Sequence, residues 1–308
     1  MATNSVRVKG GVATYETALI MNAMEHAPEP TPHARNNAGL NDSDSGELPA
    51  PTPWLPTLRA LKWHDPLRWL QAGWSDFRAQ PGIGLFYGAC FVLMGWSLAA
   101  MAAYQPAYVL ALAGGFMLVS PFLCLGLYEA SRKRELGSPT TLRRSLSTWR
   151  RNLSALAIFC GVLLVLEMLW SRSALVIFAV SFNSIPDTTN WVAMLLDPEN
   201  LGFVITYLCV GGLFASLIFA TSVVSMPMLI DHDDDTKADA ITAGLTSIRV
   251  CLDQPGVMLW WAVLIATSVG LAMLPAFLGL LVVAPVIGHA SWHAYRGIVV
   301  KGNSATSS

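Results

Sequence analysis

Six apolar runs, each long enough to cross a lipid bilayer as a helix, constrain this chain more than any other feature. They lie at about 82–104, 107–128, 153–171, 203–229, 256–274 and 276–296. A helix needs about 20 apolar residues to span the hydrocarbon core, because it rises about 1.5 Å per residue through roughly 30 Å. Only 13% of the residues are charged, well below the share usual in soluble domains. The sequence therefore predicts an all-α, polytopic membrane protein with about six transmembrane helices.

Three segments divide the chain. Residues 1–58 form a predicted disordered N-terminal tail, since 25–58 are rich in Pro, Asn, Asp, Ser and Gly and poor in aliphatic residues. Residues 59–300 form the predicted membrane domain, and 301–308 a short C-terminal tail. Within the membrane domain, 173–183 are apolar but only about half the length needed to span. We leave open whether 172–201 contain a re-entrant segment, an interfacial segment or an extension of the third helix.

Lysine and arginine are concentrated on one side of the predicted membrane. Arg172 is the one basic residue expected on the opposite side. Loops rich in Lys and Arg face the cytoplasm, so we expect a bacterial inner-membrane location with both termini cytoplasmic. A net charge of −1 gives no indication of a nucleic-acid partner. The basic residues on the predicted cytoplasmic side are Arg59, Lys62, Arg68, Arg78, Arg132, Lys133, Arg134, Arg143, Arg144, Arg150, Arg151, Lys237, Arg249, Arg296 and Lys301.

An internal repeat organises the crossings. The stretches "LQAGWSDFRAQPG" from Leu70 and "ITAGLTSIRVCLDQPG" from Ile241 share an Ala-Gly pair, an Arg five residues further on and a Pro-Gly that opens a crossing. Apolar residues recur at helical spacing before the first, third and fifth crossings, which indicates amphipathic helices in the membrane interface. The predicted architecture is three modules, each an interfacial helix followed by a two-helix hairpin.

Two histidines one helical turn apart, His289 and His293, are the candidate ligands for a metal ion or a haem. Two ligands do not complete a zinc site, which takes three or four. Further ligands could come from Asp231, His232 and Asp233, which follow the fourth crossing on the same side. The alternative is that His289 bonds a neighbouring helix while the aromatic and basic residues around His293 form an interfacial belt.

Glu167 is the one carboxylate well inside an apolar run, which makes it a candidate for proton or cation handling. We expect it near the outer end of the third crossing, where Arg172 could pair with it. The acidic run Asp231–Asp235 lacks EF-hand spacing and reads better as a solvated turn facing the basic loops. The chain carries no standard catalytic motif, so the sequence provides no reason to propose an enzyme.

The stretches "SVVSMPMLID" from Ser222 and "GHASWHAYRGIV" from Gly288 resemble a bacterial family of predicted integral membrane proteins catalogued as a domain of unknown function. The resemblance covers about 60–300 and implies a bacterial inner-membrane location with no assigned activity. Some members are labelled as cytochrome c oxidase, but a haem–copper oxidase core needs at least six histidines as ligands. Only two of the six histidines here lie in predicted crossings, which excludes a catalytic oxidase subunit.

These features predict a non-enzymatic scaffold or accessory factor in the membrane, or a small transporter. Its partners would be the lipid bilayer and other membrane proteins. Transport is the weaker version, because polar groups at the membrane midplane are scarce. The alternative is a metal- or haem-binding membrane protein that uses His289 and His293, as an accessory to a respiratory complex.

Overall fold

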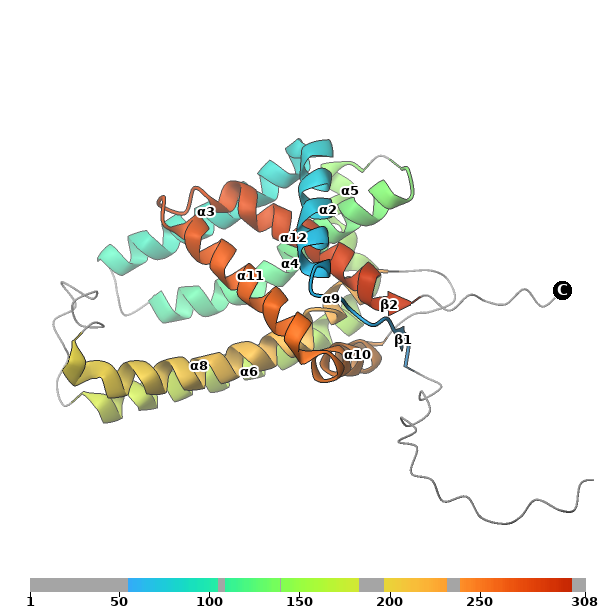
Figure 1. The fold of residues 1–308 in the computed structure, drawn as a ribbon. Helices are drawn as coiled ribbons and strands as arrows, with labels where there is room; N and C mark the ends of the chain where they lie inside the picture. Colours follow the sequence, from blue (N-terminus) through green and yellow to red (C-terminus); the bar gives the residue numbers. More distant parts are fainter. Residues whose placement is uncertain (1–54, 105–108, 139, 183–196, 232–238, 301–308) are drawn as a thin grey trace, which may run out of the picture. The chain divides into compact units, whose positions relative to one another are not determined.

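The computed structural model describes residues 55–104, 109–138, 140–182, 197–231 and 239–300. The predicted tails, except for 55–58, lie outside these residues. The described part of the chain is nearly all helical (Figure 1), which confirms the all-α membrane fold. Its elements are β1 (Thr57–Leu58), α2 (Asp65–Ala79), α3 (Pro81–Tyr104), α4 (Val109–Glu135), α5 (Leu142–Leu146), the 3-10 helix η2 (Thr148–Asn152), α6 (Leu153–Ser181), the 3-10 helix η4 (Pro198–Asn200), α8 (Leu201–Ser222), α9 (Ser225–Met228), α10 (Ala240–Asp253), α11 (Pro255–Met273), α12 (Leu280–Ile298) and β2 (Val299–Val300).

Four helical segments among the described residues are long and apolar enough to cross a membrane. They are α3, α6, α11 and the segment from η4 to α9. The remaining two predicted crossings correspond to α4 and α12, which are also long helices. The count of six crossings therefore stays a prediction.

The third predicted crossing was too short. Helix α6 continues without a break to Ser181, so 173–181 extend the third helix. Residues 183–196, where the rest of the predicted outer segment falls, lie outside the described residues. No glycine or proline interrupts α6 between Gly161 and Ser181, which explains why the helix continues beyond the minimum spanning length.

The sixth predicted crossing starts later than expected, at Leu280 rather than at 276. Ala276 and Phe277 adopt left-handed backbone conformations, with φ of 50° and 66°, and cannot continue a right-handed helix. The indole nitrogen of Trp96 on α3 donates to the Ala276 carbonyl at 2.8 Å and holds this turn against the neighbouring helix.

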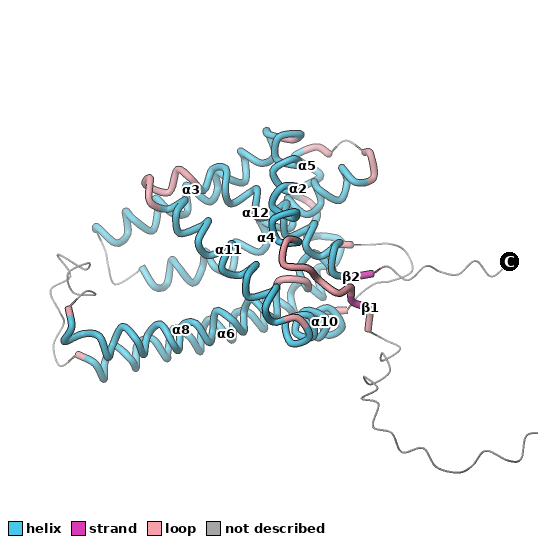
Figure 2. The backbone as a smooth tube through the Cα atoms, viewed as in Figure 1, coloured by secondary structure: helices cyan, strands magenta, loops and turns pink. Residues whose placement is uncertain are grey.

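The short amphipathic helices α2, α5 and α10 lie at the same end of the long helices (Figure 2). Helix α2 ends at Gln80, and the Pro81-Gly82 pair opens α3; Gln254 with Pro255-Gly256 does the same between α10 and α11. The two glutamines have almost the same backbone angles, φ −133° and ψ 56° against φ −136° and ψ 56°. The interfacial helix predicted for the middle module is shorter than expected, because α5 ends at Leu146 and the 3-10 helix η2 follows.

The largest cluster of buried apolar side chains lies at this end of the helices, between α2, α4, the first part of α6, α9, α10, α11 and α12. Trp261 and Trp292 are fully buried in it, and Trp69 meets Trp261 edge to face at 5.6 Å between ring centroids. Strands β1 and β2 pair here as a short antiparallel ladder, with Leu58 opposite Val299. The chain therefore enters and leaves the helical region at one place, and β1 falls within the segment that the sequence assigned to the tail.

Candidate functional site

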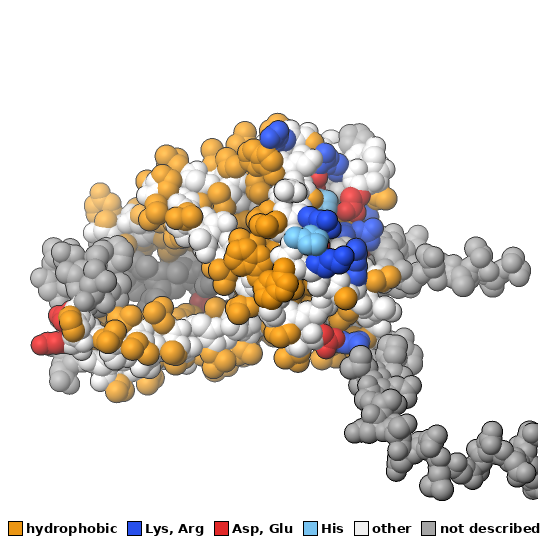
Figure 3. All heavy atoms as spheres, viewed as in Figure 1, with side chains coloured by type: hydrophobic (Ala, Val, Ile, Leu, Met, Phe, Trp, Pro, Cys, Tyr) orange, Lys and Arg blue, Asp and Glu red, His pale blue; other side chains and the backbone are white. Residues whose placement is uncertain are grey.

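Charged side chains gather at the end of the molecule where α2, α4 and α12 meet, whereas apolar side chains cover the long helices (Figure 3). Nine side chains from these helices and from the short segment after α9 form a network that we call the polar cluster. Its members are Asp76, Ser131, Arg134, Glu135, Asp231, His289, His293, Tyr295 and Arg296.

Asp76 on α2 is the centre of this network. Its carboxylate is buried and accepts hydrogen bonds from His293 Nε2 at 2.9 Å and from the Arg134 guanidinium. Burial by itself would raise the pKa of Asp76, but hydrogen bonds from His293 and Ser131 outweigh it, and the pKa lies below its usual value. The site therefore holds Asp76 as a carboxylate between His293 and the Arg134 guanidinium, which come from two other helices.

His289 lies one turn before His293 on α12, and none of its surface is exposed. Its Nδ1 atom lies 2.8 Å from Ser131 Oγ on α4. Its Nε2 atom has no hydrogen-bond partner of normal geometry, although the backbone of Leu127 lies close enough to interact with the ring. Since Ser131 also interacts with Asp76, the serine hydroxyl connects the buried imidazole to the carboxylate.

A second carboxylate, Glu135 at the end of α4, faces the other side of His293. Glu135 Oε1 lies 3.7 Å from His293 Nδ1, and Glu135 Oε2 accepts from Arg296 Nε at 3.2 Å. Arg296 also reaches Asp231, at 3.7 Å, and the Tyr295 hydroxyl donates to the same carboxylate at 2.8 Å. The cluster thus connects α12 to α2, to α4 and to the chain that follows α9.

Close backbone contact makes this arrangement possible. A side chain at Gly73 on α2 would come within 2.6 Å of the Val286 carbonyl and 2.7 Å of the Ala290 nitrogen on α12. The absence of a side chain therefore lets α2 lie directly on α12. Because Asp76 and His293 each come one turn after this contact, they meet at hydrogen-bond distance.

The structure separates the two predicted histidine ligands. His293 is held by Asp76 and Glu135, whereas His289 turns to Ser131. Among the described residues, no three His, Cys, Asp or Glu side chains are placed to hold a metal ion. His232 and Asp233 lie outside the described residues, so the metal site stays a prediction.

The alternative interpretation, in which the histidines serve helix packing and the membrane interface, is right for His289 and wrong for the residues around His293. His289 does bond a neighbouring helix, through Ser131. The predicted interfacial belt around His293 is wrong, because Trp292 is fully buried and Tyr295 nearly so. Both rings face the protein interior because α2 and α9 cover α12 on this side.

The other predicted site residues lie apart from the cluster or have other partners. Glu167 lies at the middle of α6 and not near its outer end, because the helix is longer than predicted. It forms no ion pair with Arg172 in the described structure. Asp231 is buried against Tyr295 and Arg296 rather than exposed in a turn toward the basic loops.

Sequence reasoning missed Asp76 and Ser131. Asp76 looked like one polar residue of an amphipathic helix, and Ser131 like part of a helix end. The signal that could have found Asp76 is its position in "WSDFRAQPG", within the repeated stretch, next to residues expected at the apolar face. No local pattern marks Ser131.

Residues 109–231 match the model of a family described as a predicted integral membrane protein (DUF2189). This family has unknown function, and the match confirms the resemblance noted above for that part of the chain. No curated protein and no solved structure matches the chain. The histidines of the polar cluster lie beyond the matched residues. Together with the apolar helices, the match identifies this chain as an integral membrane protein whose segment 109–231 is similar to that family.

Proposed function

We propose that this protein is a non-enzymatic membrane scaffold or accessory factor that binds other membrane proteins through α6 and α8, which we call the hairpin arm. The observation that carries the proposal is that no side chain of α8 is fully buried, and that those packed against the main core cluster, Ile218 and Phe219, lie near its polar end. On α6, buried residues stop at Leu163, near the polar end. Both helices of the hairpin arm therefore expose apolar side chains to the bilayer or to a partner.

Small residues on the exposed side of α8 favour a protein partner over lipid alone. Gly212 has no atom within 4 Å of the place where a side chain would be, whereas Gly211 next to it touches Trp170 of α6. Leu208 and Ser216 lie one turn before and after Gly212 and are also exposed. Glycine and serine at such positions let a second helix approach closely, which is how helices associate in membranes.

The aromatic contacts within the arm support a stable two-helix unit. Trp170 lies 5.1 Å from Tyr207 between ring centroids, and Phe182 lies 4.9 Å from Phe203. Such edge-to-face pairs hold α6 and α8 together without the other helices. The arm can thus keep its shape while one side faces a partner.

Scaffolding is favoured over transport by the distribution of ionisable groups. Helices α3, α8 and α11 contain no Asp, Glu, Lys, Arg or His, and α6 carries a single carboxylate, Glu167, at its middle. Transporters usually carry polar groups or broken helices near the midplane. The polar cluster lies at one end instead, and its carboxylates are already paired within the protein.

We further propose six crossings, with both termini in the cytoplasm of a bacterial cell. The pairing of β1 with β2 supports an even number of crossings, because it brings the first and last described segments together. The basic residues at this end support a cytoplasmic face. The matching Gln-Pro-Gly connections at Gln80 and Gln254 support the internal repeat.

Site-specific photocrosslinking in native membranes tests the scaffold function. A photoreactive residue replaces Leu208 on α8, and in a matched control it replaces Leu271 on α11, since both leucines are more than 60% exposed. We expect a discrete protein adduct from position 208 and little from 271. An adduct of twice the protein's mass would identify a second copy as the partner. Equal adducts from both positions, or lipid adducts alone, would contradict the proposal.

Metal or haem binding is the second candidate function, and His289 Nε2 is the observation in its favour. This atom is buried and has no normal hydrogen-bond partner, which is uncommon for a polar group in a protein interior. Metal analysis and a visible absorption spectrum of the purified protein, with a His289→Ala/His293→Ala variant beside it, test this candidate. Stoichiometric metal or a haem band that the variant loses would establish it; a metal-free, colourless protein from cofactor-replete cells would exclude it.

A further inference from the structure

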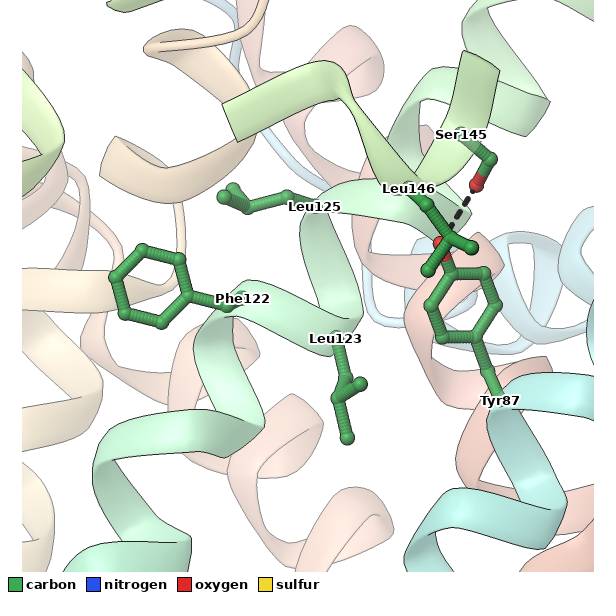
Figure 4. A pocket seen from close by; sticks show the side chains of 6 residues that line it. All are labelled: Tyr87, Phe122, Leu123, Leu125, Ser145 and Leu146. Carbon is green, nitrogen blue, oxygen red and sulfur yellow. Dashed lines mark hydrogen bonds between the residues drawn. The ribbon is translucent and has the colours of Figure 1, made fainter. Parts of the chain in front are cut away.

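A groove is lined by residues of α3, α4 and α5 and has no role in the function proposed above (Figure 4). Its volume is about 170 Å³. The residues that line it are Tyr87, Phe122, Leu123, Leu125, Ser145 and Leu146. Four of the six are apolar, and the other two carry hydroxyl groups.

The two hydroxyls in the groove already have partners. Tyr87 Oη and Ser145 Oγ lie 2.8 Å apart, and Ser145 Oγ donates to the Gly126 carbonyl at 2.7 Å. Because the Ser145 hydroxyl donates its proton to the Gly126 carbonyl, the Tyr87 hydroxyl donates its own proton to Ser145 Oγ. A ligand in the groove would therefore meet mainly hydrocarbon, which suits an alkyl chain and not a polar molecule.

The groove lies where the apolar part of α4 meets its charged end. Phe122 is one turn before Gly126 on the apolar side, and Glu129 and Arg132 follow in the other direction. A ligand in this position would reach both the hydrocarbon of the bilayer and the level of the lipid headgroups.

Helix α5, which supplies Ser145 and Leu146 to the groove, also carries an exposed cation. Arg143 on α5 is exposed and comes three residues before Leu146, so both side chains lie on one side of this helix. No carboxylate of the described residues lies within ion-pair distance of Arg143, whereas Arg144 beside it faces Glu129 at 4.0 Å. Arg143 is thus available to a negatively charged group from outside the protein.

We propose that this groove and Arg143 bind one anionic phospholipid of the bilayer, with part of an acyl chain between α3, α4 and α5 and the phosphate against the guanidinium. Arginine suits this role because its planar donors match phosphate oxygens. The proposal is independent of the hairpin arm, since none of the lining residues belongs to α6 or α8.

Native mass spectrometry of the full chain in detergent, titrated with phosphatidylglycerol or phosphatidylcholine of the same acyl chains, tests the proposal. We expect phosphatidylglycerol to bind about fivefold more tightly, since one basic residue near the membrane surface contributes about that factor. Arg143→Gln should remove most of this preference. The matched control, Arg68→Gln on α2, should keep it, because Arg68 is exposed and no residue of α2 lines the groove.

A second variant tests the groove itself. Leu146 is half exposed, so Leu146→Trp should fill the groove without disturbing the core, and it should weaken binding of both lipids. Glycerol 3-phosphate, which has the phosphate but no acyl chains, should not displace the bound lipid. Equal binding of the two phospholipids to the wild type would overturn the proposal. So would a loss of preference in Arg68→Gln as large as in Arg143→Gln, or unchanged binding in Leu146→Trp.

Discussion

The polar end formed by α2, α4 and α12 and the hairpin arm formed by α6 and α8 are both built from long helices, yet they differ in what their glycines meet. Gly73 on α2 lies so close to α12 that a side chain would come within 2.6 Å of the Val286 carbonyl, whereas Gly212 on α8 faces open space. The glycine at the polar end is used for a helix contact within the chain. Gly212 on the arm has no such contact, which agrees with the partner surface proposed above.

The two regions also differ in their polar groups. Asp76, His293 and Glu135 connect three helices through partly buried polar contacts. The arm is held by aromatic contacts and by the hydroxyl of Ser171, which bonds within its own helix. If this contrast is correct, substitutions at the polar end should change the stability of the whole domain, and those on the arm should not.

The largest effect is expected from Asp76→Ala. This change leaves His293 and Arg134 without their buried carboxylate, and breaking a buried pair costs about 3–5 kcal/mol. Because Arg134 is 37% exposed, we expect the lower end, about 3 kcal/mol. Thermal or denaturant unfolding in one detergent measures it. The control is Asp253→Ala, which removes an exposed pair with Arg249 on α10 and should change stability by less than about 0.5 kcal/mol.

The pH dependence of the same carboxylate sharpens this prediction. The pKa of Asp76 is lower in the folded protein than in the unfolded chain, where it is about 3.9. Its charge therefore stabilises the fold above about pH 4, and this contribution is lost as the pH falls through the lower folded pKa. The stability difference between the wild type and Asp76→Asn should be larger at pH 6 than at pH 3. A difference that stays constant over this range would show that the charge of Asp76 does not matter.

A smaller loss is expected from Ser131→Ala. The variant removes the hydroxyl that faces His289 Nδ1, so that a fully buried imidazole keeps no side-chain partner. Leaving a buried polar group without a partner costs about 1–3 kcal/mol. Unfolding measurements beside Ser97→Ala give the comparison, because Ser97 is exposed on α3 and bonds only to its own helix. Equal stability of the two variants would mean that His289 does not need Ser131.

The smallest effect on the domain is expected from Trp170→Leu on the arm. Trp170 contacts Tyr207 and Phe214 of α8, and an aromatic pair contributes about 0.5–1.5 kcal/mol. Because the arm packs on the other helices mainly near its polar end, the loss should stay below about 1 kcal/mol. Trp292→Leu, in the buried core of the polar end, is the comparison and should cost more. A greater loss from Trp170→Leu would show that the arm is part of the core.

The sequence predicted the helices well and their contacts poorly. Apolar runs and Gln-Pro-Gly connections are local signals, so the helix starts at Pro81 and Pro255 came within one residue of the structure. The end of α6 was left open between three alternatives, of which an extension of the third helix is the one found, because the polar residues 171–173 interrupt the apolar run without stopping the helix.

The polar cluster could be predicted only in part. His289 and His293 stand out because histidine is rare in apolar helices, but their partners lie on other helices, more than 150 residues away in sequence. The meeting of Asp76 with His293 depends on the contact of Gly73 with α12, and a contact between distant segments leaves no local pattern. The spacing of the two histidines suggested one shared ligand, whereas packing directs them to different partners.

One pair of variants tests the contrast between the two regions most directly. Gly73→Leu and Gly212→Leu introduce the same side chain at the polar end and on the arm, and each variant is measured for stability and for photocrosslinking from position 208. We expect Gly73→Leu to lose about 2–3 kcal/mol of stability through overpacking. Gly212→Leu should stay within about 0.5 kcal/mol of the wild type and lose the adduct, because its side chain occupies the partner's place. An adduct that survives Gly212→Leu, or equal destabilisation by both variants, would contradict the account.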